Sequence, residues 1–517
     1  MNKSPVLQPK QFTIAQKIIS LLFLSIFTII LIILLCFDWV PYCSTIKNNL
    51  FPNIISLIIA ALISITIYYL FRNISPSNRS LYIIFAIVFV LIFIFQVILL
   101  HFTYFYTGWD PKIVNTLADN TANAGLYTTA GQDAYLTLYP NNAFIVSLLA
   151  LIKTIPFLGK KYLFLLIINT LVVDASGLLA CLTIKKLVSN KAAVLSLFAI
   201  TPIVLLSPWI IIPYSDTLSM LFPILVFFIY ITSNKWWKYG VIIFLSLIGY
   251  FIKPTAIIVL IAIILIELCM KKWKIRSLRY APSKTSLLKI LGITNGICLA
   301  LLLKNIGLRY INYQPNPDTQ PVSFIHYLAM GQNSENCGGF LEQDYDETKY
   351  GANFEFKKFC GRLMDRSLQE HMNFFTRKLL MNFNDGSFAW GGEGYFYYEI
   401  PERNSQITNL LSSIFYSNGS NYTLLSQTQQ IVWIFVLFGC LFAYKNNPTK
   451  NHSVLQLSLI GLFMFLMLFE ARARYSYCYS PLFVTCAFLG YSNLSKRIKE
   501  LCHRKNNKPA PNKPRPS

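Results

Sequence analysis

The chain has 517 residues, of which 55% are hydrophobic and only 13% are charged. A soluble domain usually carries about 25% charged residues, so this composition excludes an ordinary soluble protein. The formal net charge is +23. Lys and Arg occur in short clusters between apolar stretches and in the C-terminal tail, a distribution that indicates membrane topology and not nucleic-acid binding.

Several apolar stretches approach the roughly 20 residues that cross a bilayer as a helix. The sequence therefore predicts an all-α polytopic membrane protein with twelve spans and both termini in the cytoplasm. No small-residue cleavage site follows the basic N-terminus, so we expect the first span to be retained. The expected spans are 15–36, 54–71, 81–101, 162–184, 192–207, 214–232, 238–252, 254–270, 286–303, 429–444, 453–470 and 476–492.

The segment 139–161 is apolar enough to be counted as another span, and the basic clusters decide against it. Counting it would place the lysine cluster at 185–191 outside, against the usual cytoplasmic bias of Lys and Arg. We therefore expect 143–158 to form an amphipathic helix along the outer interface, between Pro140 and a break at Pro156.

Two large regions are expected outside the membrane, a first loop at 102–161 and a net acidic region at 304–428 whose main element is a helix over 353–381. Cys337 and Cys360 lie in the second region, and they form either a disulfide or two free thiols. The chain is accordingly divided into 1–80 (N-terminal tail and two extra spans), 81–303 (transmembrane core with the first outer loop), 304–428 (extracytoplasmic region), 429–492 (C-terminal spans) and 493–517 (basic cytoplasmic tail).

Ionisable residues gather where five separate stretches reach the outer face. Such groups are costly at membrane depth and usually face a cavity or a partner. They are Asp110 in "YTGWDPKIV", Asp133 later in the same loop, Asp216 in "PYSDTLSM", Lys253 in "GYFIKPTA", and Glu470, Arg472 and Arg474 in "FEARARYSY". Their convergence predicts a site at the outer leaflet that holds both carboxylates and cations.

Each of these residues also has a purely structural interpretation. Asp110 and Asp216 can cap helices, and Lys253 can extend to the lipid headgroups. The two arginines can bind lipid phosphates, and Glu470 can simply pair with one of them. Tryptophans near span ends, such as Trp209 and Trp433, are typical of an interfacial belt.

Taken together, carboxylates beside Arg and Lys suit transfer of a group from a lipid-linked phosphate. A carboxylate can take the proton from an attacking hydroxyl. Cations stabilise the charge on the departing phosphate, and arginine can do so through two parallel hydrogen bonds.

At these residues the chain resembles the GT-C superfamily of membrane glycosyltransferases, which includes protein O-mannosyltransferases, lipid A aminoarabinose transferases and GPI mannosyltransferases. Five features over roughly residues 80 to 492 carry the resemblance. They are the acidic residue Asp110 in a large first outer loop, the interfacial helix in "YPNNAFIVSLLALIKTIPFLG", the basic hairpin and Ser/Thr-Pro exit in "CLTIKKLVSNKAAVLSLFAITP", the acidic stretch "PYSDTLSMLFP", and the late Arg-Tyr…Pro element "EARARYSYCYSPLF". The resemblance is one of element order and not of a tight motif.

The resemblance implies a GT-C-like bundle that transfers a sugar, with inversion, from a polyprenyl-phosphate donor to an acceptor hydroxyl on a glycan, lipid or protein. The resemblance implies that Asp110 is the catalytic base and that Asp216 positions the acceptor or supports the base. The residues expected to bind the donor or its phosphate are Lys253, Arg472, Arg474 and Glu470, with Asp133, His326 and Glu393 as weaker candidates. No cofactor is expected, and scattered histidines favour metal-independent catalysis.

The chain departs from the family pattern in two respects: two spans precede the one before the first outer loop, and that loop lacks an adjacent Asp-Glu pair. Two alternative functions stay open, a polysaccharide polymerase and a translocator of lipid-linked glycans. The Lys-, Asn- and Ile-rich composition suggests a bacterial plasma membrane, with the active site on its outer face.

Overall fold

The computed structural model describes residues 10–37, 53–71, 73–124, 129–155, 162–270, 284–394, 397–403 and 405–506. Within these ranges the chain is an all-α polytopic membrane protein, as its composition predicts, and its strands form one two-stranded ribbon. Seven of the described helices are long and apolar enough to cross a membrane by length and composition, and five further apolar helices are shorter. The count of twelve spans, their orientation and the division into domains remain predictions.

Helices occupy nearly all of the ranges in which spans are expected. They are α1 (Lys10–Cys36), α2 (Asn53–Phe71), α3 (Asn78–Thr103), α7 (Tyr162–Leu187), α10 (Ser215–Leu218), α11 (Leu221–Thr232), α12 (Lys238–Ile252), α13 (Ile258–Met270), α14 (Lys284–Tyr310), α21 (Tyr422–Leu441), α22 (Lys450–Leu468) and α24 (Ser480–Asn506). The range 192–207 is not one continuous helix. It divides into α8 (Asn190–Leu195), α9 (Leu197–Ile200) and a π-helical turn at Thr201–Leu205. The π-helical turn contains Pro202, which has no N–H to continue the α-helical hydrogen bonds.

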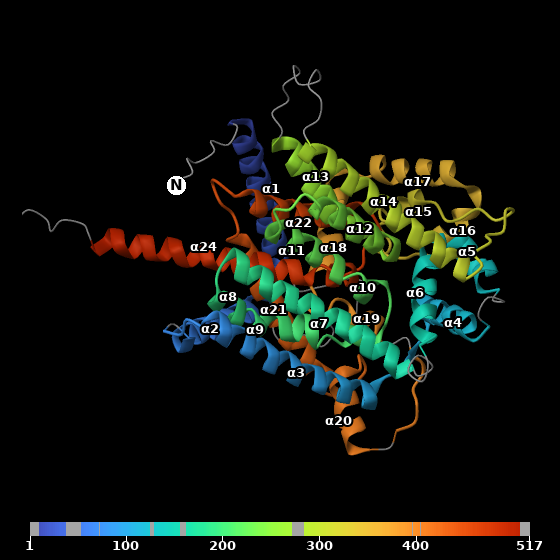
Figure 1. Cartoon of the computed structure of the whole chain (residues 1–517), viewed down its shortest axis with the longest axis horizontal. Coiled ribbons are helices and arrows are strands. Elements are labelled where there is room, and N and C mark those ends of the chain that lie inside the picture. Colours follow the sequence, from blue (N-terminus) through green and yellow to red (C-terminus); the bar gives the residue numbers. More distant parts are fainter. Residues whose placement is uncertain are drawn as a thin grey trace, which may run out of the picture.

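The helices pack into one bundle whose centre is formed by α7, α21 and α24 (Figure 1). Helix α21 packs against α2 and α24, and α7 packs against α3, α11 and α24. At the crossing of α21 with α24, Gly439 lies against Gly490, so that the two backbones approach closely. Trp209 and Trp433 are fully buried in this bundle and donate hydrogen bonds to backbone carbonyls. The prediction that they belong to an interfacial belt is therefore wrong.

The first outer loop folds as helices at one end of the molecule (Figure 1): α4 (Trp109–Ala124), α5 (Ala134–Leu138) and α6 (Ala143–Lys153). Helix α6 corresponds to the helix expected over 143–158, but it ends at Lys153, and 156–161 lies outside the described residues. The Lys153 ammonium lies 2.6 Å from the Asp119 carboxylate, which joins α6 to α4. The location of α6 in the membrane interface remains a prediction.

The second outer region contains α15 (Phe324–Met330), α16 (Glu342–Asp346), α17 (Ala352–Met364), α18 (Leu368–Phe383), α19 (Trp390–Glu393) and α20 (Gln406–Phe415). The prediction of a single helix over 353–381 is wrong, because the helix is interrupted between α17 and α18. The cause is a capping box in which the Ser367 hydroxyl accepts from the Glu370 N–H and the Glu370 carboxylate accepts from the Ser367 N–H. Such a pair starts a new helix.

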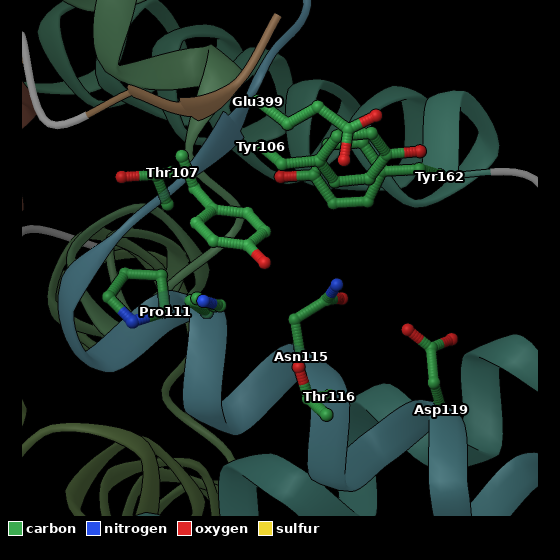
Figure 2. Close-up of a pocket in the computed structure, with 10 residues that line it drawn as sticks. Tyr106, Thr107, Pro111, Asn115, Thr116, Asp119, Tyr162 and Glu399 are labelled. Atoms are coloured by element: carbon green, nitrogen blue, oxygen red, sulfur yellow. The ribbon is translucent and has the colours of Figure 1, made fainter.

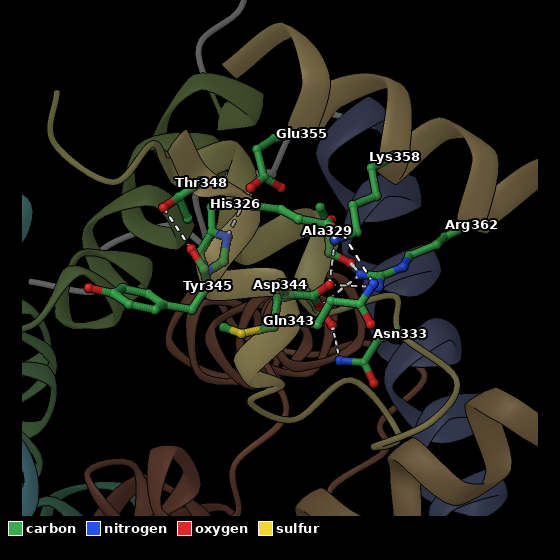
Figure 3. Close-up of polar contacts among 12 residues, drawn as sticks. His326, Ala329, Asn333, Gln343, Asp344, Tyr345, Thr348, Glu355, Lys358 and Arg362 are labelled. Atoms are coloured by element: carbon green, nitrogen blue, oxygen red, sulfur yellow. Dashed lines mark hydrogen bonds and ion pairs between the residues drawn. The ribbon is translucent and has the colours of Figure 1, made fainter. Parts of the chain in front are cut away.

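A network of ion pairs joins α15, α16 and α17 (Figure 3). The buried Asp344 carboxylate accepts two hydrogen bonds from Arg362, at 2.8 and 2.9 Å, and lies 2.6 Å from the Lys358 ammonium. His326 Nδ1 lies 3.2 Å from a Glu355 carboxylate oxygen in the same network. The region is thus a folded unit and not an extended loop. Both Cys337 and Cys360 are free thiols, in agreement with the second of the two expected alternatives.

We predict that Gly490→Ala destabilises the bundle by several kcal/mol, because a Cβ at this position would overlap the Gly439 carbonyl oxygen in α21. The melting temperature of the detergent-solubilised protein measures this loss. The matched control is Gly292→Ala in α14, where the nearest atom to an added Cβ is 3.6 Å away. Equal melting temperatures for the two variants would contradict the prediction.

Candidate functional site

Asp110 lies in the first turn of α4, directly after a strained residue. Trp109 has φ of 26°, a region that bulky L-residues rarely adopt and that costs of order 1–3 kcal/mol. Strand β1 (Tyr106–Thr107), which pairs antiparallel with β2 (Tyr397–Glu399), leads into this turn. This turn places Trp109 and Asp110 side by side at the start of α4.

The surroundings of Asp110 raise the pKa of its carboxyl group. The main cause is burial, which Arg474 and a hydrogen bond from Tyr135 partly offset. The Tyr135 hydroxyl itself accepts a hydrogen bond of 2.6 Å from the Asn142 side chain. The Asp110 carboxylate is therefore held in place by neighbouring groups and is poorly hydrated. In such surroundings a carboxylate is a stronger base than in water.

Arg474, which begins α23 (Arg474–Tyr477), lies at the centre of the charged residues. Its guanidinium stacks on the Trp109 ring at 4.1 Å, and that ring and the Tyr214 ring form an edge-to-face pair with centres 5.6 Å apart. The Arg474 Nε is 3.2 Å from Glu393 and its Nη1 is 4.0 Å from Asp216. Burial acts to lower the Arg474 pKa, but these two carboxylates more than compensate and raise it.

Neither of these contacts has hydrogen-bond geometry. The buried Nε and Nη1 atoms of Arg474 therefore have no hydrogen-bond partner. A buried donor that is left unsatisfied costs about 1–3 kcal/mol, and more when it is charged. The guanidinium is thus held by charge and stacking while its N–H groups stay available for an acceptor atom.

Asp216 and Lys253 form a buried ion pair beside Arg474. Asp216 lies in α10 at the start of an apolar segment, and Lys253 follows α12 immediately before Pro254. The Lys253 ammonium also lies 4.1 Å from the centre of the Tyr475 ring. Two stretches 37 residues apart thus bring a carboxylate and an ammonium to one point.

Arg472 and Glu470 complete the cluster. The Arg472 Nε donates to Glu470 at 2.9 Å, and its Nη1 lies 3.1 Å from Glu393. The Tyr475 hydroxyl donates to the other Glu470 oxygen at 2.7 Å. Burial acts to raise the Glu470 pKa, but Arg472 and this hydrogen bond lower it below its ordinary value. We name Asp110, Asp216, Lys253, Glu393, Glu470, Arg472 and Arg474 the charged cluster.

The second outer region holds the turn that carries Glu470, Arg472 and Arg474. From α18, the Lys378 amine donates to the Phe469 carbonyl at 2.7 Å and also to the Gly331 carbonyl. One turn further along, the Asn382 side chain accepts the Arg472 N–H at 3.1 Å. Two residues on consecutive turns of one helix thus fix the backbone of this charged turn.

The structure brings together seven of the nine residues singled out in the sequence, the members of the charged cluster. Asp133 instead caps α5, accepting the Tyr135 N–H at 2.8 Å, and so acts on the site only through Tyr135. His326 instead contacts Glu355 of α17 (Figure 3). The catalytic and binding roles of all nine remain predictions.

Four aromatic residues of this site were not singled out in the sequence: Trp109, Tyr135, Tyr214 and Tyr475. Each is adjacent to, or within two residues of, a charged residue that was, which is the signal that was overlooked. Within the described ranges, no group of three or more His, Cys, Asp or Glu side chains is placed to hold a metal ion.

Residues 11–494 match the family model described as "conserved hypothetical integral membrane protein", and the chain belongs to this family. No curated protein matches the chain. Among solved structures, the archaeal oligosaccharyltransferase AglB from Archaeoglobus fulgidus, in complex with an inhibitory peptide and a dolichol-phosphate, is similar over 82% of this chain and 52% of that chain. The identity is 13% and the TM-score 0.35, a likeness too low to carry an argument. This chain spans about half the length of that protein.

Burial lowers the pKa of Lys378 to about 7, which predicts a specific pH dependence of stability. Between about pH 7 and the ordinary lysine pKa of 10.5, the unfolded chain holds a proton that the folded chain has lost. The free energy of unfolding should therefore rise with pH across this window and fall as the pH drops toward 7, by up to about 1.4 kcal/mol per pH unit.

Melting curves of the wild type and of Lys378→Met across this window measure the effect. The methionine variant should lack this part of the rise, so its deficit relative to the wild type should grow with pH. Lys349→Met, at an exposed lysine of the same region, should follow the wild type. A deficit in Lys378→Met that is constant with pH would contradict the prediction.

Proposed function

We propose that this membrane protein is a glycosyltransferase that moves a sugar from a polyprenyl-phosphate donor to an acceptor hydroxyl at the outer face. The observation that carries the proposal is the buried Arg474 guanidinium, whose Nε and Nη1 have no hydrogen-bond partner and whose stacking partner, Trp109, immediately precedes Asp110. The proposed anion-binding group thus contacts the ring of the residue that immediately precedes the proposed general base.

In this proposal, the donor phosphate binds beside Arg474 and Lys253. A phosphate oxygen supplies the acceptor that the Arg474 N–H groups lack, with the fork geometry that guanidinium and phosphate share. Lys253 adds a second cation within the same low-dielectric site. Arg472 is already bound to two carboxylates, Glu470 and Glu393. In this proposal it does not bind the donor, but holds Glu393, the carboxylate that it shares with Arg474.

In the proposed reaction, the acceptor oxygen attacks the anomeric carbon of the donor from the face opposite the phosphate. Its proton passes to the Asp110 carboxylate as the new C–O bond forms. The bond between the anomeric carbon and the phosphate oxygen breaks, and its electron pair remains on the polyprenyl phosphate. Charge thus develops on the oxygen that Arg474 and Lys253 contact, where preorganised cations stabilise it.

Asp216 has a supporting role in this proposal. It is paired with Lys253 and lies 4.0 Å from Arg474, so its negative charge holds both cations in place in the absence of donor. The family resemblance seen in the sequence gives the same donor class. A bacterial plasma membrane, cytoplasmic termini and a glycan, lipid or protein acceptor belong to the proposal as well.

A transfer assay with the purified protein and a panel of radiolabelled polyprenyl-phosphate sugars tests the proposal. Asp110→Asn should lower the transfer rate by roughly 10²–10⁴, as expected for loss of a general base. The wild-type rate should rise with pH through a pKa above 3.8, the ordinary aspartate value, because the base must be ionised. Asp346→Asn, at an exposed position in the second outer region, should leave the rate unchanged.

Full activity of Asp110→Asn would refute the base assignment. Consumption of no donor in the presence of an acceptor-containing membrane extract would refute the transferase. Flipping of a lipid-linked glycan without any new product linkage would instead identify a translocator, and extension of an existing glycan that is independent of Asp110 would identify a polymerase.

Arg474→Lys should raise the KM for the donor at least tenfold, equivalent to about 1.4 kcal/mol, because lysine keeps the charge but loses the stacking and the second N–H. Arg403→Lys is the matched control. Arg403 also stacks on an aromatic ring, that of Tyr104 at 3.9 Å, but lies outside the charged cluster. The same rise in KM for both variants would show that the effect is structural.

A further inference from the structure

A polar pocket lies against α4 on the face that turns away from Asp110. Figure 2 shows Asn115 and Asp119 projecting from α4 toward Tyr106 and Glu399 of the two-stranded ribbon and Tyr162 of α7. Its cavity volume is about 180 Å³, which is roughly the share of six liquid water molecules. The space suits one small polar ring and not a lipid chain.

The chemistry of the walls favours a neutral polyhydroxylated ligand. Tyr106 and Tyr162 form a tilted stack with ring centres 4.7 Å apart, and Tyr398 adds a third ring that covers the Lys112 ammonium at 3.2 Å. Aromatic faces pack against the apolar faces of sugar rings, and tyrosine adds a hydroxyl at its edge. One face of each ring is taken up by these contacts, so a sugar would meet the opposite faces or the ring edges with their hydroxyl groups.

The polar groups of the pocket match hydroxyl groups better than an anion. The Asn115 Oδ1 is buried without a hydrogen-bond partner, so it can accept from a ligand hydroxyl. Glu399 and Asp119 also accept, and Asp119 is already neutralised by Lys153 at 2.6 Å. Lys112 is the cation that lines the pocket, and its ammonium lies on the Tyr398 ring. An anionic ligand would also lie beside the Glu399 carboxylate, which disfavours it.

The pocket and Asp110 share the first turn of α4. Thr107 and Pro111, which lie on either side of Asp110 in the chain, both line the pocket. At 100° per residue, Lys112, Asn115 and Asp119 lie on the opposite helix face from Asp110. A ligand longer than one sugar ring can therefore occupy the pocket and cross this turn toward the carboxylate.

We propose that this pocket is a carbohydrate subsite, which binds a neutral sugar residue of the acceptor away from the reacting hydroxyl. The inference rests on the proposed transferase for the identity of the acceptor, although sugar binding by the pocket can be tested without transfer. It makes the acceptor a glycan and not a protein side chain.

The test is binding of the purified full chain, in nanodiscs, to an array of neutral and acidic oligosaccharides. Wild type should retain neutral oligosaccharides, and Tyr398→Ala and Asn115→Ala should each weaken retention at least tenfold. The control is Tyr350→Ala, since Tyr350 and Tyr398 are equally exposed at 60%, and it should bind as wild type.

Retention of no neutral oligosaccharide, a preference for acidic ones, or an equal loss in Tyr350→Ala would overturn the subsite. In the transfer assay, Tyr398→Ala should raise the acceptor KM while leaving the donor KM unchanged. Transfer that depends on Asp110 but not on Tyr398 would refute the subsite alone. Retention of neutral sugars by a protein that consumes no donor would refute the transferase alone.

Discussion

The buried guanidinium of Arg474 is the constraint on which the rest of the site depends. An arginine taken out of water must be compensated by nearby negative charge or by a π face, because its desolvation costs several kcal/mol. Here Glu393, Asp216 and the Trp109 ring provide that compensation. These three groups come from separate parts of the chain. The positive charge of Arg474 therefore holds these three parts together in the fold.

The second outer region serves this arrangement as much as its own stability. Lys378 and Asn382 on α18 fix the backbone of the turn at 469–472, and Glu393 reaches the charged cluster from α19. The ion pairs among α15, α16 and α17 give the region the rigidity that such positioning requires. A site whose charges are oriented before a ligand arrives needs little reorganisation when charge develops in a reaction.

The strained backbone at Trp109 fits the same principle. Strain of this kind persists where surrounding contacts outweigh it, and it concentrates at functional positions. The indole is fixed by Arg474 on one face and by Tyr214 at its edge, and these contacts offset the cost of the positive φ. The turn "GWDPK" therefore has a structural reason beyond helix capping, since it presents the ring and the carboxylate at one point.

The sequence by itself determined the membrane class, most helix positions and the gathering of charges near one set of helix ends. These features depend on the local composition of the chain, because apolar runs must be buried or face lipid and charges are excluded from the bilayer centre. Only the tertiary structure decided which charges pair, that Glu393 joins the charged cluster while His326 does not, and that Trp209 and Trp433 are core residues. Such contacts join residues as much as 258 positions apart, as Asp216 and Arg474 are, and they depend on helix order and packing, which no local pattern encodes. The break between α17 and α18 has a different cause, because the capping box of Ser367 and Glu370 is a local pattern. It was missed because the apolar residues on both sides of it keep a continuous helical spacing.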